Sequence, residues 1–186
     1  GGTWDSVSFP SDATARLLRL QAADRTIADI VIAVGDDCDV ELHRTYSSGV
    51  AWQDNSESEL GGWSYVSPTE ESVVFVRGES LEAPCAAPTN VHATTAAVRL
   101  VCEGTAYERP TDGQWTALDA PGQVLALANS SDGPVFAAVT NACDGVAVSR
   151  SGAESCVSEN PGATALAAGA DPGKGVELVH KVRERS

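Results

Sequence analysis

Short apolar runs separated by turn-forming residues dominate the pattern of this chain. Val, Ile, Leu and Ala gather in brief runs, and Gly, Pro, Asn, Asp and Ser interrupt them. No stretch sustains the spacing of three and four residues that an amphipathic helix requires. The pattern therefore predicts an all-β fold built from many short antiparallel strands.

The predicted strands follow from β-branched content, alternation and flanking turn signals. We expect strands at residues 1–9, 27–34, 40–46, 72–77, 96–102, 105–109, 122–128, 135–140, 146–150, 162–168 and 176–182. Residues 15–22 fit either a strand or a short helix. Residues 53–60 are polar and acidic, and residues 79–90 contain two prolines, so both segments are predicted to be loops.

The predicted strands recur in a repeating order. Residues 30–52, 98–115 and 135–156 each give a strand, a tight turn, a second strand, another turn and a capping residue. Four apolar runs mark about four such units, which are spaced by roughly 40 to 55 residues, the length of one propeller blade. These runs are Leu17–Leu20, Val73–Val76, Val124–Leu127 and Ala165–Ala168.

The most specific stretch in the repeat is the turn from Thr45 to Trp52. Thr45 and Ser47 carry hydroxyls that can bond nearby backbone groups, and Gly49 can adopt a positive φ. Trp52 is expected to cover the turn from the next strand. Weaker copies of this turn are formed by Asp112, Gly113 and Trp115, and by Ser149, Gly152 and Cys156.

These turns resemble the Asp-box, or BNR, repeat of sialidase-like and sortilin-like β-propellers. The family pattern is Ser/Thr-x-Asp-x-Gly-x-x-Trp/Phe; Thr45, Gly49 and Trp52 match it, whereas Ser47 stands where Asp is expected. The resemblance implies a β-propeller-like domain of about four blades over residues 1–186. It also implies two alternatives for the termini: both complete the last blade, or the chain is a segment of a larger propeller.

Five cysteines and the absence of a C-x-x-C motif indicate disulfides in an exported protein rather than a zinc site. Cys143 and Cys156 flank one predicted hairpin, so a bridge between them is geometrically easy. Cys85 and Cys102 could tie the proline-containing loop to its sheet, which leaves Cys38 as the odd thiol. Pairing of Cys38 with Cys85 or with Cys102 is the alternative.

Charge narrows the choice of partners. The chain carries 26 acidic and 12 basic residues, a net charge of −14. Nucleic acid and anionic membranes would be repelled by this charge. No apolar run reaches the length of about 20 residues that a membrane helix needs, so we expect no membrane insertion by this segment. The first residues, which lack a Met, suggest that a signal or anchor precedes them.

Candidate catalytic and metal-binding groups are sparse in the sequence. A sialidase would need clustered arginines, a Tyr–Glu pair and an Asp acid, yet Arg44, Arg109 and Arg150 occupy equivalent positions before the turns and are expected to be structural. Asp36, Asp37 and Asp39 are a weak calcium candidate, although a solvated acidic turn is the preferred interpretation. His43 and His180 are expected on strand surfaces. We therefore expect no cofactor and no catalytic residue.

These observations favour a non-catalytic binding or scaffold module outside the cytoplasm, in a bacterial cell envelope or secreted. Its expected partner is another protein docked on a propeller face; a glycan is the second ligand class. The rival hypotheses are a sialidase-like glycoside hydrolase and a structural repeat segment of a larger envelope protein. Function argued from fold alone is analogy, so each of these is an expectation.

Overall fold

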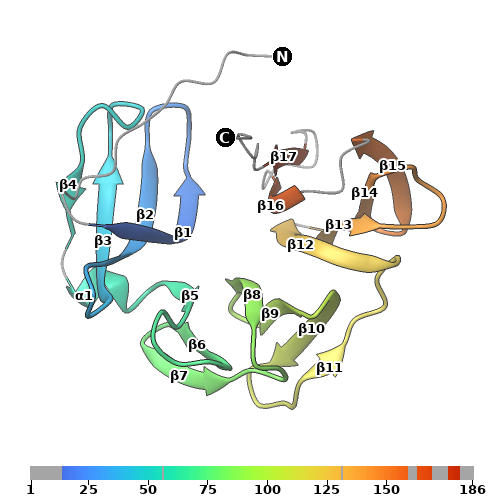
Figure 1. Cartoon of the computed structure of the whole chain (residues 1–186), viewed down its shortest axis with the longest axis horizontal. Coiled ribbons are helices and arrows are strands. Elements are labelled where there is room, and N and C mark those ends of the chain that lie inside the picture. Colours follow the sequence, from blue (N-terminus) through green and yellow to red (C-terminus); the bar gives the residue numbers. More distant parts are fainter. Residues whose placement is uncertain (1–13, 56, 131, 159–162, 169–175, 181–186) are drawn as a thin grey trace. The chain divides into compact units, whose positions relative to one another are not determined.

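The computed structural model describes residues 14–55, 57–130, 132–158, 163–168 and 176–180 of the chain (Figure 1). They form an all-β protein whose single helix within these ranges has four residues. Contacts divide the chain into two compact units, Gly1–Leu81 and Glu82–Ser186, where the sequence analysis expected one domain. The predicted strand at residues 1–9 lies outside the described residues.

The first unit contains a four-stranded sheet in the order β1-β2-β3-β4 and most of a three-stranded sheet in the order β5-β6-β7. The strand bounds of the first sheet are β1 Ala15–Ala22, β2 Ala28–Val34, β3 Asp39–Thr45 and β4 Gln53–Asp54. Those of the second sheet are β5 Ser64–Val66, β6 Val73–Val76 and β7 Glu79–Glu82, and helix α1, Glu57–Leu60, connects the two sheets.

The second unit contains two further four-stranded sheets and a two-stranded one. The first of them comprises β8 Pro88–Ala93, β9 Ala97–Cys102, β10 Thr105–Pro110 and β11 Thr116–Ala117. The next comprises β12 Gln123–Ser130, β13 Gly133–Val139, β14 Val146–Arg150 and β15 Ala153–Ser158. The last pair is β16 Ala163–Ala168 and β17 Val176–His180. In each four-stranded sheet the strands follow chain order, as in a simple antiparallel meander.

Of the two alternatives for residues 15–22, the structure shows the strand. Two other predictions about local structure need correction. The predicted loop at residues 53–60 instead forms the two-residue strand β4 and the helix α1. The predicted loop at residues 79–90 contains β7 and the start of β8. Short polar strands such as β4 and β7 gain their hydrogen bonds from a neighbouring strand, which local pattern does not reveal.

The repeat also has a different phase from the predicted one. The run Val73–Val76 is the middle strand of the three-stranded sheet. It does not belong to the sheet that contains the strand at residues 97–102. The place before that strand is taken by β8, a proline-containing segment. The described residues therefore contain five sheets, compared with the predicted count of about four units. Because the three-stranded sheet is short, its apolar run was counted with the unit at residues 98–115 and not as a unit of its own.

Apolar faces of successive sheets pack together inside each unit. In the first unit, Val31 and Leu42 of the first sheet are buried in one cluster with Tyr65 of the second sheet. Tyr65 stacks on Phe75 with ring centroids 5.2 Å apart, and burial raises the pKa of the Tyr65 hydroxyl. A residue such as Val31, with no exposed surface, contributes about 1.5–3 kcal/mol through burial.

In the second unit, the packing joins the β8–β11 sheet to the β12–β15 sheet. Val101 of β9 and Ala106 of β10 share a buried cluster with Val124, Leu127 and Phe136 from β12 and β13. The opposite face of the β12–β15 sheet has a separate apolar cluster. Both faces of this sheet are therefore apolar, which explains why its strands have little polar alternation.

Two disulfides link the cysteine pairs that the sequence analysis preferred. Cys85 bonds to Cys102 and Cys143 bonds to Cys156, across 17 and 13 residues respectively. Cys38 is free and half-buried in the turn between β2 and β3. The two bridges indicate an oxidising, extracytoplasmic environment. No helix among the described residues is long and apolar enough to cross a membrane.

We predict that replacing Cys143 and Cys156 together with Ser lowers the free energy of unfolding by about 2–4 kcal/mol, because the unfolded chain loses a covalent constraint. Urea denaturation of the variant and the parent protein measures the difference. Cys38→Ser is the matched control and should leave stability nearly unchanged. Alkylation of the denatured but unreduced parent should label one thiol per chain; labelling of four or five would contradict the oxidised pairing.

Candidate functional site

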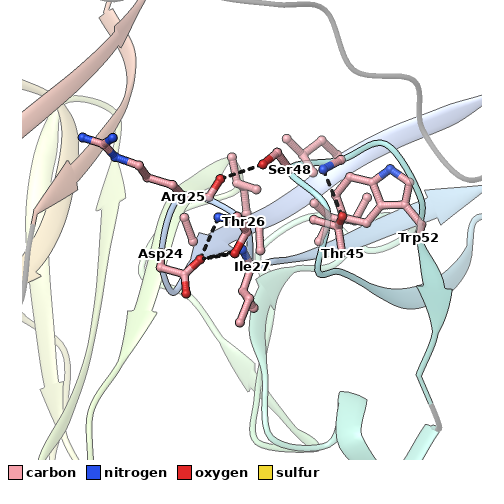
Figure 2. Close-up of a pocket in the computed structure, with 13 residues that line it drawn as sticks. Asp24, Arg25, Thr26, Ile27, Thr45, Ser48 and Trp52 are labelled. Atoms are coloured by element: carbon pink, nitrogen blue, oxygen red, sulfur yellow. Dashed lines mark hydrogen bonds between the residues drawn. The ribbon is translucent and has the colours of Figure 1, made fainter.

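Two turns of the first sheet lie at the same end of that sheet. The strand register sets Ala22 opposite Ala28, and Ala28 opposite Thr45. The turn from β1 to β2 and the turn that follows β3 therefore leave the sheet side by side. Ser48 joins them: its backbone N–H donates to the carbonyl of Thr26 at 2.9 Å, and its hydroxyl donates to the carbonyl of Arg25 at 3.0 Å (Figure 2).

The turn after β3 is organised by two hydroxyls. The buried Thr45 Oγ1 accepts hydrogen bonds from the backbone N–H of Ser47 at 3.2 Å and of Gly49 at 2.9 Å. Ser47 Oγ accepts from the N–H of Ala51 at 2.9 Å. Gly49 has a φ of 84°, a conformation that favours glycine. Ser47 thus supplies a side-chain acceptor at the position where the repeat pattern has an Asp.

The turn between β1 and β2 is organised by a carboxylate. Asp24 Oδ1 accepts from the backbone N–H groups of Thr26 at 2.7 Å and Ile27 at 2.8 Å, and from the Thr26 hydroxyl at 2.9 Å. These hydrogen bonds lower the pKa of Asp24, and the bond from the Thr26 backbone N–H has the largest effect. The charged carboxylate is therefore the form that holds this turn.

A pocket of about 440 Å³ lies beside the two turns (Figure 2). Its polar lining comes from the turns, whereas its apolar lining comes mainly from β1, β2 and Trp52. The apolar lining residues are Leu17, Leu20, Ala22, Ile27, Ala28, Ile30, Gly49 and Trp52. The polar ones are Asp24, Arg25, Thr26, Thr45 and Ser48. In Figure 2 the guanidinium end of Arg25 is directed away from Thr45 and Trp52.

The predicted turn at Asp112, Gly113 and Trp115 connects β10 to β11 and is built differently. The Gly113 N–H donates to the carbonyl of Pro110 at 3.0 Å. A Cβ at Gly113 would meet the Pro110 ring at 2.9 Å, so this position requires glycine. Trp115 Nε1 donates to the carbonyl of Glu82 at 2.8 Å, and Asp112 is exposed. This turn lacks the paired hydroxyl acceptors of the turn after β3.

The predicted turn at Ser149 and Gly152 also departs from the expected box. Ser149 is a buried residue within β14, and it lies opposite Glu154 of β15. The turn itself consists of Ser151 and Gly152, which both have positive φ, at 51° and 82°. Two such residues give the tight hairpin whose twist matches its strands. Ser149 therefore lies in the strand that precedes the turn, as Thr45 lies at the end of β3.

The three arginines at equivalent repeat positions make local contacts. Arg44 Nε and Nη2 bond the two carboxylate oxygens of Asp29 on the neighbouring strand, at 2.6 and 3.0 Å. Arg150 pairs with Asp132 at 2.9 Å. Arg109 Nε donates to the carbonyl of Gly113 at 2.9 Å. Each guanidinium is thus held within its own sheet or turn, as the sequence analysis expected.

His43 was expected on a strand surface, but the structure buries it. Its side chain is 5% exposed, with Nε2 2.8 Å from a Glu41 carboxylate oxygen and Nδ1 2.9 Å from one of Asp54. Asp54 belongs to β4, which pairs with β3 directly at His43. The sequence analysis predicted a loop there, so it could not foresee that a neighbouring strand would face this histidine. The side chain of His180 lies outside the described residues.

No metal-binding cluster is found among the described residues. Asp36, Asp37 and Asp39 surround the turn between β2 and β3 and are exposed. Within residues 14–55, 57–130, 132–158, 163–168 and 176–180, no group of three or more His, Cys, Asp or Glu side chains could hold a metal ion. The pocket on the first sheet was not anticipated from the sequence, although its residues Thr45, Gly49 and Trp52 were singled out for the turn.

Comparison with protein-family models, with curated proteins and with solved structures finds no match. The function must therefore be argued from the geometry of the pocket and its sheet.

We predict that Thr45→Val lowers the free energy of unfolding by about 1–2 kcal/mol, because the backbone N–H groups of Ser47 and Gly49 lose their common acceptor. Thr45→Ser keeps the hydroxyl and serves as the matched control. Urea denaturation measures both variants. An equal loss of stability in the two variants would show that the hydroxyl does not organise the turn.

The Asp24 turn predicts a dependence of stability on pH. Because folding lowers the pKa of Asp24, its contribution is present at neutral pH and is lost as pH falls from the unfolded pKa of about 3.9 through the lower folded pKa. Asp24→Asn should reduce this acid-dependent loss while keeping a side-chain acceptor. Thermal denaturation of both proteins between about pH 6 and pH 2.5 tests this; identical pH profiles would contradict it.

Proposed function

We propose that this chain is a non-catalytic binding module that acts outside the cytoplasm and docks a protein partner. The observation that carries the proposal is the open pocket on the first sheet, where Leu17 and Leu20 are 44% and 55% exposed. Large apolar side chains that gather at a concave surface mark an interaction site. The two locked turns, joined through Ser48, give that surface a fixed rim.

The sheets of this module are proposed to be blades of a β-propeller-like fold, secreted or attached to a cell envelope. Meander sheets in chain order, packed through their apolar faces within each unit, support this arrangement. The turn at Thr45, Ser47 and Gly49 supports the relationship to Asp-box repeats. The completion of one blade by both termini involves residues outside the described ranges and stays a prediction.

A protein partner fits the pocket better than the other ligand classes. The lining is mostly apolar, and its polar atoms are already used by the turns: Thr45 Oγ1, Ser48 Oγ and Asp24 Oδ1 all take part in internal hydrogen bonds. A glycan would need polar groups that converge on its hydroxyls. A nucleic acid would meet a chain with a net charge of −14.

The absence of catalysis is also part of the proposal. A sialidase-type site needs arginines that are available to a carboxylate substrate, whereas Arg44 and Arg150 are engaged by Asp29 and Asp132. The pocket brings Asp24 together with hydroxyls and apolar groups, but with no histidine, cysteine or tyrosine among its lining residues. Its chemistry is that of recognition.

Photocrosslinking tests the proposed function. A benzophenone attached at Val50→Cys, beside the pocket, should capture a protein that the same probe at Val157→Cys does not. The captured protein is then purified and its Kd measured by calorimetry. Leu20→Asp should weaken binding by about 30-fold, the scale of an interface hot spot. Val157→Asp is the matched control, because Val157 and Leu20 are 50% and 55% exposed.

Unchanged affinity of the Leu20→Asp variant would contradict docking at this pocket. Hydrolysis of a fluorogenic sialoside by the purified chain, lost in Arg44→Ala but retained in Arg25→Ala, would contradict the non-catalytic assignment and favour the glycosidase hypothesis.

A further inference from the structure

The first strands of two different sheets share an irregularity that aligns them residue by residue. In β1 the register with β2 shifts between Leu17 and Arg19. In β12 the register with β13 shifts between Val124 and Ala126. A bulge of this kind inserts one residue and locally increases the twist of the strand. Aligning the two bulges places Leu17 at the position of Val124, and it places Leu20 at the position of Leu127.

The second strands extend this correspondence. Leu20 lies opposite Ile30 on β2, and Leu127 lies opposite Phe136 on β13. The trio of Leu17, Leu20 and Ile30 on the first sheet therefore corresponds to the trio of Val124, Leu127 and Phe136 in the second unit. Leu17, Leu20 and Ile30 all line the pocket.

The trio in the second unit is covered by another sheet. Val124, Leu127 and Phe136 are 2%, 0% and 6% exposed, and they share a buried cluster with Val101 and Ala106 of the preceding sheet. The cover is a pair of antiparallel strands, β9 and β10, which present small and β-branched side chains. This face of the β12–β15 sheet is thus buried under the β8–β11 sheet.

Among the described residues of the first unit, no sheet covers the corresponding face of the first sheet. Leu17 and Leu20 keep 44% and 55% exposure, while the opposite face of the same sheet is buried through Val31 and Leu42. Leu17 and Leu20 therefore lack the burial that stabilises the equivalent residues in the second unit. The difference in burial between the two faces shows where a contact is absent on the first sheet. The β9–β10 pair shows what kind of element can make that contact.

We propose that the face bearing Leu17 and Leu20 docks the apolar face of an antiparallel β-sheet from a partner protein, in the way that β9 and β10 cover Val124 and Leu127. This inference rests on the proposed function and specifies the kind of partner. The partner's strands present alternating small apolar side chains to Leu17, Leu20 and Ile30. The turns that carry Asp24 and Trp52 border one end of the contact, so they limit how the docked sheet is aligned.

The cover must come from another polypeptide if the pocket is open in the isolated chain, and thiol accessibility tests this. Leu20→Cys, Leu127→Cys and Val157→Cys are made singly in a Cys38→Ser background and alkylated with N-ethylmaleimide. We expect Leu20→Cys to react within about threefold of Val157→Cys, and Leu127→Cys to react about 100-fold more slowly, because it needs local opening. Protection of Leu20→Cys at the level of Leu127→Cys would mean that the chain covers its own face, and it would overturn the proposal.

Crosslink spacing then tests whether the partner presents a sheet. A benzophenone at Val50→Cys or at Ala22→Cys is photolysed in the complex with the captured partner, and the partner residues are mapped by mass spectrometry. Sites separated by two residues, on adjacent strands, are expected for a docked sheet face. Sites separated by three and four residues would indicate a helix and would overturn the inference, although docking at the pocket would stand. If the partner instead binds the Leu20→Asp variant as tightly as the parent protein, the proposed function itself is refuted.

Discussion

The structure is built around central strands whose side chains are buried on both faces of the sheet. Strand β2 of the first sheet and strand β13 of the β12–β15 sheet are apolar almost throughout, from Ile30 to Ala33 and from Val135 to Ala138. A strand of this kind has no face suited to water, so its sheet must be covered on two sides. Stacking of successive meander sheets supplies that cover within each unit. In the first unit, the face that bears Leu17 and Leu20 is partly exposed, and the pocket lies on this face.

The turns decide how the edges of that face are shaped. Thr45 gathers two backbone N–H groups, and Ser48 ties its own turn to the carbonyls of Arg25 and Thr26. These bonds satisfy backbone groups that leave the sheet without a strand partner. They also rigidify two segments that would otherwise move independently. A rigid rim around an apolar surface lowers the entropy cost of docking, which is why a structural turn and a binding surface can occupy the same place.

Local pattern predicted much of the secondary structure for a clear reason. Runs such as Val31 to Ala33 and Val146 to Val148 contain β-branched residues between strong turn formers, so their strands are specified by nearby residues. Strands β4, β5, β7, β8, β11 and β15 were not predicted; Gln53, Glu79 and Pro88, for example, carry no such signal. The bridge between Cys143 and Cys156 could be anticipated from hairpin spacing. Burial of His43 could not, because it depends on a strand whose own sequence is polar.

Local sequence was enough to predict that the chain is all-β, that Thr45 and Gly49 build a tight turn, and that the net charge disfavours polyanions. These properties depend on composition and on neighbours within a few residues. Leu20 is exposed whereas Leu127 is buried, although both are leucines in similar first strands, and this difference arises from the packing of the sheets. The physical reason is that burial depends on which sheet packs against a strand, and that contact joins residues distant in the chain. The same distinction separates a core position from a docking surface.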